Sequence, residues 1–299
     1  MIISLCLDIA GPNREAGSLT VYREQAAAID AGEPDLVILA GEAGGAMVPP
    51  SIEALVSSAW ITDVLKNACV VVGLPAVQSI PFHVARALSA VDFLSAGRAG
   101  WMPIVNDIAR FDASYGTHFV GAGLEVVARS DDFVQATQAL WDSWDDDALI
   151  LNKESGEYLD STKVRRVDYR GPFYRTMGPL NAARPPQGYP ILVRDADIEK
   201  GSAIATDIAI GSADALATEG NATRKLLRVD ASDAGALTTA KNAVLAGEAD
   251  GVHLAGPSAV QALIALRAEI PAVVSSGKTA RQAFGLNRPT NAFADGVVV

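Results

Sequence analysis

Short apolar runs alternate with amphipathic segments along most of the chain. Met1–Ala10 and Asp35–Ala40 are dense in apolar residues without strict period-two alternation, which is typical of strands covered on both faces of a parallel sheet. Val21–Ala31 lies between them and carries apolar residues at a helical period before Gly32, a common residue after a helix end. The pattern predicts consecutive strand–helix–strand units.

The same order continues to the end of the chain. Further strands are predicted over Cys69–Gly73, Trp101–Asn106, Ile191–Arg194, Ile208–Ser212, Leu227–Asp230 and Gly251–Leu254. Further helices are predicted over Ile52–Lys66, Pro81–Ser95, Asp131–Trp144 (with Ser130 as N-cap), Ile198–Asp207, Ala213–Leu226, Leu237–Ala246 and Ser258–Glu269. Eight strand signals and eight helix signals predict an α/β fold, a (β/α)8 TIM barrel forming a single domain over residues 1–299. A doubly wound open sheet is the alternative.

One segment departs from this alternation. Residues 145–189 are rich in charge and turn residues, with a short hairpin predicted over Val167–Met177. We interpret them as an excursion from the barrel, between the fourth helix and the fifth strand.

The amino-acid composition argues against two classes of binding partner, nucleic acid and anionic membranes. With 49% hydrophobic residues and a formal charge of −11, the chain is a folded protein, and it lacks the basic excess that nucleic acid or an anionic membrane surface requires. Cys6 and Cys69 lie in apolar runs and are expected to be buried thiols of a reducing compartment. No signal peptide is recognised, and the longest apolar runs are about half the ~20 residues of a membrane-spanning helix. We expect a cytoplasmic protein.

Candidate chemistry is sparse. The three histidines are far apart in the sequence and lack the spacing of common zinc sites, so no metal centre is expected. In a parallel barrel the pocket lies at the carboxyl ends of the strands. The candidate rim residues are Glu42, Gln78, His118, Asp195 and His253. Each one alone is more often a rim or capping residue than a catalytic one.

Four long blocks carry a resemblance to a known family. They are PFHVARALSAVDFLSAGRAGW at 81–101, LWDSWDDDALILNKESGEYLD at 140–160, VDYRGPFYRTMGPLNAARPPQGYPILV at 167–193 and TARQAFGLNRPTNAF at 279–293. In order and spacing the chain resembles the bacterial-luciferase-like flavin-dependent monooxygenases, in the branch of nitrilotriacetate and dibenzothiophene-sulfone monooxygenases. The resemblance spans nearly the whole chain, which is shorter than typical members and is expected to have lost loops.

This resemblance implies a TIM barrel, usually dimeric, that oxygenates a small organic substrate. It implies reduced FMN supplied by a separate flavin reductase, or a deazaflavin in its place. By the same resemblance, the positions expected to contact the cofactor are Trp101, Asn106, Arg194 and Gly201.

The departures from the family pattern fall where the cofactor is expected. Met102 stands where the family has a flavin-contacting asparagine, and the phosphate-binding serines after the fifth strand are absent, although Gly201 remains. Asp195, Asp197 and Glu199 occupy that loop, and each carboxylate at ~5–6 Å would cost a phosphate on the order of 1 kcal/mol. The sequence predicts an eroded site with impaired or altered FMN binding. The alternative is a non-catalytic relative that binds no cofactor and serves as a binding or partner subunit.

Overall fold

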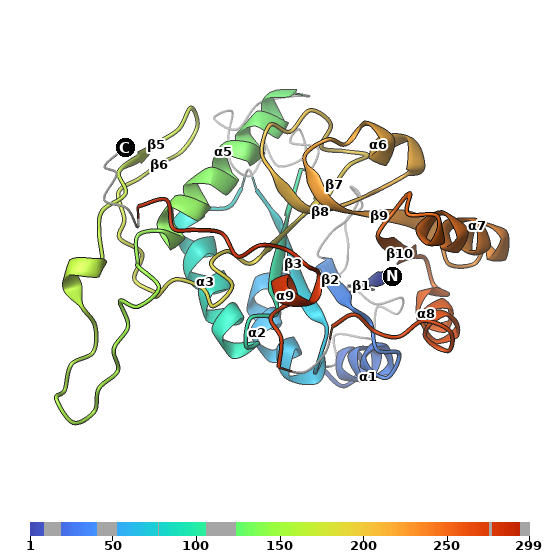
Figure 1. Cartoon of the computed structure of the whole chain (residues 1–299), viewed down its shortest axis with the longest axis horizontal. Coiled ribbons are helices and arrows are strands. Elements are labelled where there is room, and N and C mark those ends of the chain that lie inside the picture. Colours follow the sequence, from blue (N-terminus) through green and yellow to red (C-terminus); the bar gives the residue numbers. More distant parts are fainter. Residues whose placement is uncertain (9–18, 41–52, 77, 106–123, 275–276, 294–299) are drawn as a thin grey trace.

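The computed structural model describes residues 1–8, 19–40, 53–76, 78–105, 124–274 and 277–293. Within these residues eight parallel strands close into a barrel in the order β1-β10-β9-β8-β7-β4-β3-β2 (Figure 1). The strands are β1 (Ile2–Asp8), β2 (Leu36–Ala40), β3 (Cys69–Pro75), β4 (Ala99–Ile104), β7 (Ile191–Asp195), β8 (Thr206–Gly211), β9 (Ala222–Asp230) and β10 (Gly251–Ala255). The predicted TIM barrel is confirmed, and the open-sheet alternative is wrong because β1 pairs with β10.

Helices surround this barrel. They are α1 (Leu19–Asp30), α2 (Ala54–Val64), α3 (Pro81–Leu94), α5 (Leu124–Trp141), α6 (Ala213–Thr218), α7 (Ala234–Leu245), α8 (Ala259–Arg267) and the short α9 (Ala280–Ala283). None of the helices in the described part of the chain is long and apolar enough to cross a bilayer.

Three helix predictions were wrong. The fourth helix begins at Leu124 instead of Asp131, and the predicted N-cap Ser130 lies inside it, where its hydroxyl donates to Glu199. Residues 198–205 form turns and not a helix. The helix predicted over 213–226 ends at Thr218, since the chain from Ala222 onward pairs in β9 with both neighbouring strands. Tertiary partners overrode the local pattern in each case.

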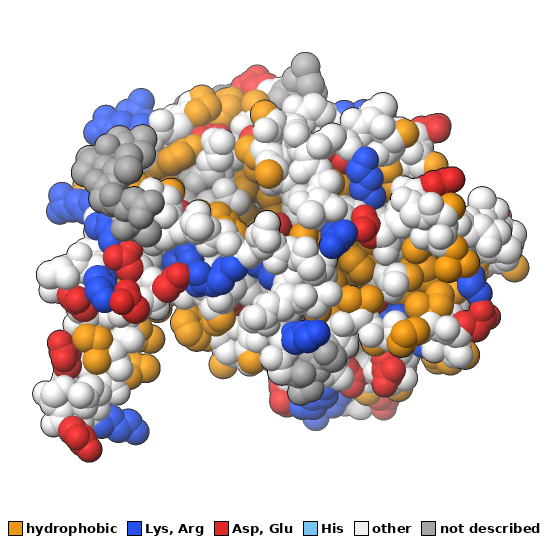
Figure 2. Space-filling view, viewed as in Figure 1, with side chains coloured by type: hydrophobic (Ala, Val, Ile, Leu, Met, Phe, Trp, Pro, Cys, Tyr) orange, Lys and Arg blue, Asp and Glu red, His pale blue; other side chains and the backbone are white. Residues whose placement is uncertain are grey.

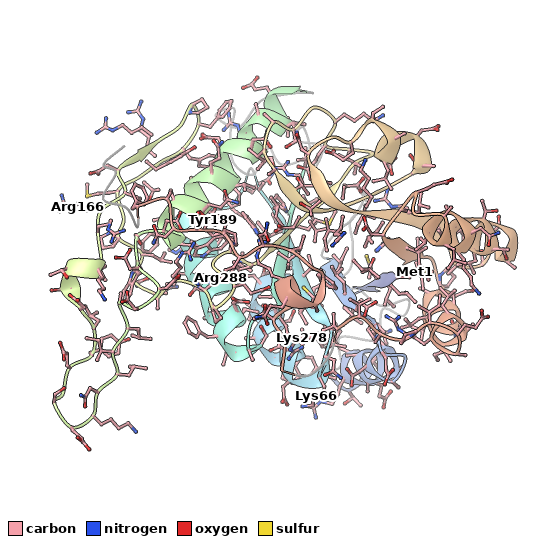
Figure 3. All side chains as sticks on the ribbon, viewed as in Figure 1. Met1, Lys66, Arg166, Tyr189, Lys278 and Arg288 are labelled. Atoms are coloured by element: carbon pink, nitrogen blue, oxygen red, sulfur yellow. The ribbon has the colours of Figure 1, made fainter. Side chains whose placement is uncertain are left out.

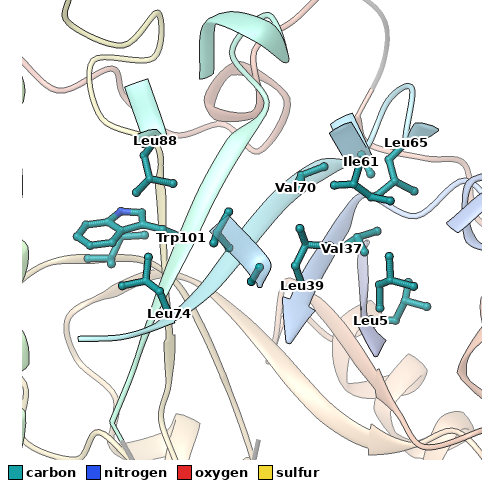
Figure 4. Close-up of a cluster of buried hydrophobic side chains, with 14 of the residues drawn as sticks. Leu5, Val37, Leu39, Ile61, Leu65, Val70, Leu74, Leu88 and Trp101 are labelled. Atoms are coloured by element: carbon teal, nitrogen blue, oxygen red, sulfur yellow. The ribbon is translucent and has the colours of Figure 1, made fainter. Parts of the chain in front are cut away.

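Two apolar layers hold the barrel together. The wall between strands and helices is one layer, and Figure 4 shows part of it around Leu39, Val70 and Trp101. The barrel interior is the other, closed at one end by Phe284 after α9. Cys69 is buried there, as expected, but Cys6 is exposed. The prediction for Cys6 was wrong because strand alternation turns it toward the barrel interior near the carboxyl end of β1, where its side chain is exposed.

The excursion leaves the barrel between α5 and β7. It contains the 3-10 helix η3 (Ser161–Lys163) and the hairpin of β5 (Tyr169–Arg170) and β6 (Arg175–Thr176), which confirms the predicted hairpin. The two ends of the excursion are joined just after α5, since the Trp144 indole N–H donates to the Leu180 carbonyl at 2.7 Å. The buried Arg184 pairs with Asp142 at 3.0 Å in the same region.

Candidate functional site

The carboxyl ends of the barrel strands form a mouth at which several polar side chains meet. Three of the residues predicted for this rim or for cofactor contact, Glu42, His118 and Asn106, lie outside the described residues. The account below therefore rests on β1, β4, β7, β9 and β10 and on the turns that follow them.

A buried histidine is the centre of the described part of the mouth. Ser4, His253 and Arg228 lie side by side in register on β1, β10 and β9, and strand alternation turns all three into the barrel. His253 Nδ1 lies 2.8 Å from Ser4 Oγ, and His253 Nε2 lies 3.8 Å from Cys6 Sγ. Burial, assisted by the Arg228 charge, lowers the pKa of His253 to about 4. The imidazole is therefore neutral at physiological pH and can donate one hydrogen bond and accept another.

Arg228 connects the mouth to the turn that follows β7. Its guanidinium donates to Asp195 Oδ2 and to Asp197 Oδ2, both at 2.6 Å. Asp197 in turn accepts from the Ser212 hydroxyl at 2.6 Å, and Ser212 caps α6. The negative charges of Asp195 and Asp197, two of the three carboxylates in this turn, are thus balanced by Arg228. The sequence analysis did not propose Arg228 as a site residue.

Arg194 points away from this cluster. It lies 2.7 Å from Asp131 of α5 and 2.5 Å from Glu199, in a buried group between β7 and α5. Burial raises the pKa of Glu199 to about 7, although Arg194 opposes the shift. The guanidinium thus ties the barrel wall to α5, and its predicted contact with a cofactor stays a prediction.

The turn after β7 can be compared directly with what a phosphate group requires. A phosphate nest needs backbone N–H groups that are open to the ligand. The N–H of Ala196 donates to Ile210 O at 2.9 Å, and the N–H groups of Asp197 and Glu199 donate to Asp195 at 3.0 and 2.8 Å. Ile198 also bonds to Asp195, and Ala203 bonds to Asp131. Residues 196–199 therefore do not fit the phosphate of FMN.

The remaining predicted residues lie apart from one another. Trp101 is fully buried on the outer face of β4, with ring centroids 5.6 Å from Trp141 and 6.1 Å from Phe133. Gly201 is exposed with a positive φ of 83°, and Gln78 is half-buried in the turn after β3. Of the predicted residues, the structure brings Asp195 and His253 to the mouth, joined through Arg228. Period-two alternation in β9, which places Arg228 in line with Asp230, was the sequence signal that could have identified it.

Comparison with known proteins shows which proteins this chain resembles in sequence. No family profile matches the chain. The chain is 30% identical over 204 residues to N-acetyl-S-(2-succino)cysteine monooxygenase of Bacillus subtilis, covering 66% of this chain and 46% of that protein. It is 34% identical over 159 residues to dibenzothiophene-sulfone monooxygenase of Rhodococcus erythropolis, covering 52% and 33%. The matched region thus spans about half or less of these curated relatives.

Solved structures agree on the fold. The crystal structure of a long-chain alkane monooxygenase superposes with a TM-score of 0.77 at 15% identity, covering 95% of each chain. That identity supports the fold alone, whereas the sequence relatives carry the homology. By its sequence relatives, the chain is a homologue of the luciferase-like monooxygenases.

Proposed function

We propose that this chain is a flavin-dependent monooxygenase that acts on a small organic substrate at the mouth of the barrel. The observation that carries the proposal is the 30% identity over 204 residues to a monooxygenase. Reduced flavin, supplied by a separate reductase, would provide the chemistry of oxygen transfer. The chain itself would provide the walls of the pocket and the polar groups that orient the substrate.

The described side of the mouth suits a substrate with one polar end. His253 stays neutral and is held by Ser4, so it can orient a hydroxyl, carbonyl or thioether group without carrying charge. Across the barrel, β4 contributes the half-buried Met102 and Ile104, an apolar surface. We assign no acid or base role here, because the cofactor normally performs the reaction in such sites.

For the cofactor we propose FMN bound weakly, with a deazaflavin as the alternative. This rests on the N–H groups of residues 196–199, which are all used within the protein and so offer a phosphate no open donor in that part of the turn. The same observation favours a second candidate function, a non-catalytic relative that acts as a partner subunit.

Calorimetric titration with FMN, riboflavin and a deazaflavin separates these proposals. We expect FMN and riboflavin to bind within a few-fold of each other, because the turn after β7 does not grip the phosphate. The exposed Lys200 in that turn provides the paired variant, Lys200→Gln, with Lys278→Gln near α9 as the control. FMN binding on the order of a hundredfold tighter than riboflavin, a difference of about 2.7 kcal/mol, and lost in Lys200→Gln alone, would contradict the weak-phosphate proposal.

Turnover is tested in a separate experiment. Purified protein is mixed with NADH, FMN and a flavin reductase, and oxygen uptake is followed with a panel of thioethers, sulfones and amino-carboxylates. Oxygenated product that depends on the protein supports the monooxygenase. Absence of binding by every flavin and of product would sink the monooxygenase proposal and favour the partner subunit.

A further inference from the structure

The hairpin of β5 and β6 holds two like charges side by side. Arg170 and Arg175 are directly opposite each other in its antiparallel ladder, and side chains at two such positions lie on the same face. Like charges directly opposite each other destabilise a sheet. This short hairpin therefore carries a repulsion between two guanidinium groups that an anion bound between them would relieve.

The protein does not neutralise these two arginines. Both side chains are exposed, and neither forms an ion pair or a hydrogen bond with a residue that the structure describes. The same is true of Arg166, which Figure 3 places at the left edge of the molecule. Figure 2 shows basic side chains gathered at the upper left, over the hairpin. On a chain with a formal net charge of −11, this is a local excess of positive charge.

The opposite face of the hairpin is fixed to α5. The Tyr169 hydroxyl donates to Asp132 of α5, and Asp132 also accepts from the N–H groups of Phe173 and Tyr174 at 2.6 and 2.7 Å. Because Tyr169 faces α5, the next side chain, Arg170, faces away from it. The arginines therefore project from a backbone that is already ordered, which lowers the entropy lost on binding a ligand.

A bulge lies beside the arginines. The N–H groups of Val167 and Asp168 both donate to the Met177 carbonyl, at 2.9 and 3.2 Å, and Asp168 has a positive φ of 42°. Two residues thus oppose one, which is the arrangement of a β-bulge and which redirects the side chains around it. A hollow of about 260 Å³ lies here, lined by Asp168, Tyr169, Arg170, Arg175, Thr176 and Met177.

The size and lining of the hollow favour a compact oxyanion. Its volume is below the ~300 Å³ at which pockets for drug-sized ligands begin. A guanidinium binds phosphate or carboxylate oxygens through two parallel N–H donors, so two of them side by side suit a ligand with two negative charges. Met177, 55% exposed, can contact the carbon part of such a ligand. Asp168 is the one acidic lining residue, and its carboxylate opposes an anion.

We propose that this hollow binds a small dianion, a phosphate ester or a dicarboxylate, between Arg170 and Arg175. None of the lining residues belongs to a barrel strand, so the site is separate from the mouth of the barrel. A bound dianion neutralises the like-charged pair and stabilises the hairpin. The proposal depends neither on flavin nor on catalysis.

Calorimetric titration tests the site with four probes: inorganic phosphate, glycerol phosphate, succinate and acetate, at an ionic strength held constant with chloride. We expect phosphate and glycerol phosphate, or succinate, or all three, to bind in the millimolar range, and the singly charged acetate to bind more weakly. Binding by the phosphates alone identifies the ligand as a phosphate ester, and binding by succinate alone identifies it as a dicarboxylate.

Four variants locate the binding. Arg170→Gln/Arg175→Gln should weaken it at least about tenfold, and Asp168→Asn should tighten it by removing the opposing carboxylate. Lys66→Gln/Lys278→Gln removes two charges at sites marked in Figure 3, away from the hairpin, and should bind as the unaltered protein does. Lys200→Gln, in the turn after β7, should also bind normally.

Unfolding temperatures separate a binding site from a purely structural role. Without a dianion, Arg170→Gln/Arg175→Gln should unfold at the same temperature as the unaltered protein or at a higher one, because the repulsion is gone. With the dianion that binds, the unaltered protein and the lysine control should gain more stability than the arginine variant, since a ligand stabilises only the state that binds it.

Three results would overturn the proposal. They are the absence of binding by every dianion, binding that is equally strong in the arginine variant, and binding that is lost in Lys200→Gln but kept in the arginine variant. The last result would assign the anion to the turn after β7.

Discussion

Acidification should lower the free energy of unfolding of this protein through protonation of His253. The perturbation is a shift from about pH 7.5 to about pH 5, compared between the unaltered protein and His253→Asn, whose amide can still reach Ser4. In the unfolded chain the pKa is 6.5, whereas burial and Arg228 lower it to about 4 in the fold. The unfolded state therefore binds the proton first as pH falls, and stability is lost between these two values.

The magnitude follows from the two pKa values. Near pH 5 the unfolded histidine is almost fully protonated and the folded one is almost fully neutral, which corresponds to a loss of about 2 kcal/mol relative to pH 7.5. Asp92 and Glu199 have pKa values raised by burial to about 6 and about 7, so they favour the folded state as pH falls. Both are present in the two proteins and cancel in the comparison.

Urea unfolding followed by tryptophan fluorescence measures the effect, because Trp101 and Trp141 are fully buried. We expect the unaltered protein to lose about 2 kcal/mol more than His253→Asn on acidification. An equal loss in both proteins would refute the reasoning, since it would mean that His253 takes up its proton equally in the folded and unfolded states.

Two further predictions concern the scaffold. Gly171→Ala should lower the unfolding temperature by several degrees and free the hairpin from α5, because the new methyl group would lie 1.7 Å from Asp132 Oδ1. Gly220→Ala, which has open space around it, is the control; equal unfolding temperatures of the two variants would contradict the predicted clash. Asp35→Ala should lower the free energy of unfolding, measured with urea, by about 3–5 kcal/mol, because it leaves the Arg267 guanidinium and three backbone N–H groups without this acceptor. A loss under about 1 kcal/mol would show that the Asp35–Arg267 pair contributes little.

The pattern of apolar residues was sufficient to predict the order of strands and helices in the barrel. It was insufficient where hydrogen bonds to polar side chains determine the backbone conformation. The runs that begin at Cys69 and at Gly251 became strands as predicted, since such a run is stable only when both faces are covered. The turn at 198–205 was mistaken for a helix because its backbone N–H groups bond to Asp195 and Asp131, one of them from a helix far away in sequence. No local pattern reports such a partner.

The candidate site shows the same division. His253 and Asp195 could be proposed from their positions at strand ends, whereas Arg228, which joins them, was not proposed, although period-two alternation places it in line with Asp230. Arg194 was expected at the cofactor, but its charge is engaged by Asp131 and Glu199. Side-chain direction on a strand depends on register and closure, and both are properties of the whole barrel.

The sequence by itself determined the alternation of strands and helices, the charged excursion and the relationship to luciferase-like monooxygenases, because these are carried by local periodicity and by long matching blocks. Only the tertiary structure decided which residues share the mouth. Ser4 and His253 are 249 residues apart and touch because the first strand closes the barrel against the last. It also decided which charges are paired, as in the contacts of Arg228 with Asp195 and Asp197.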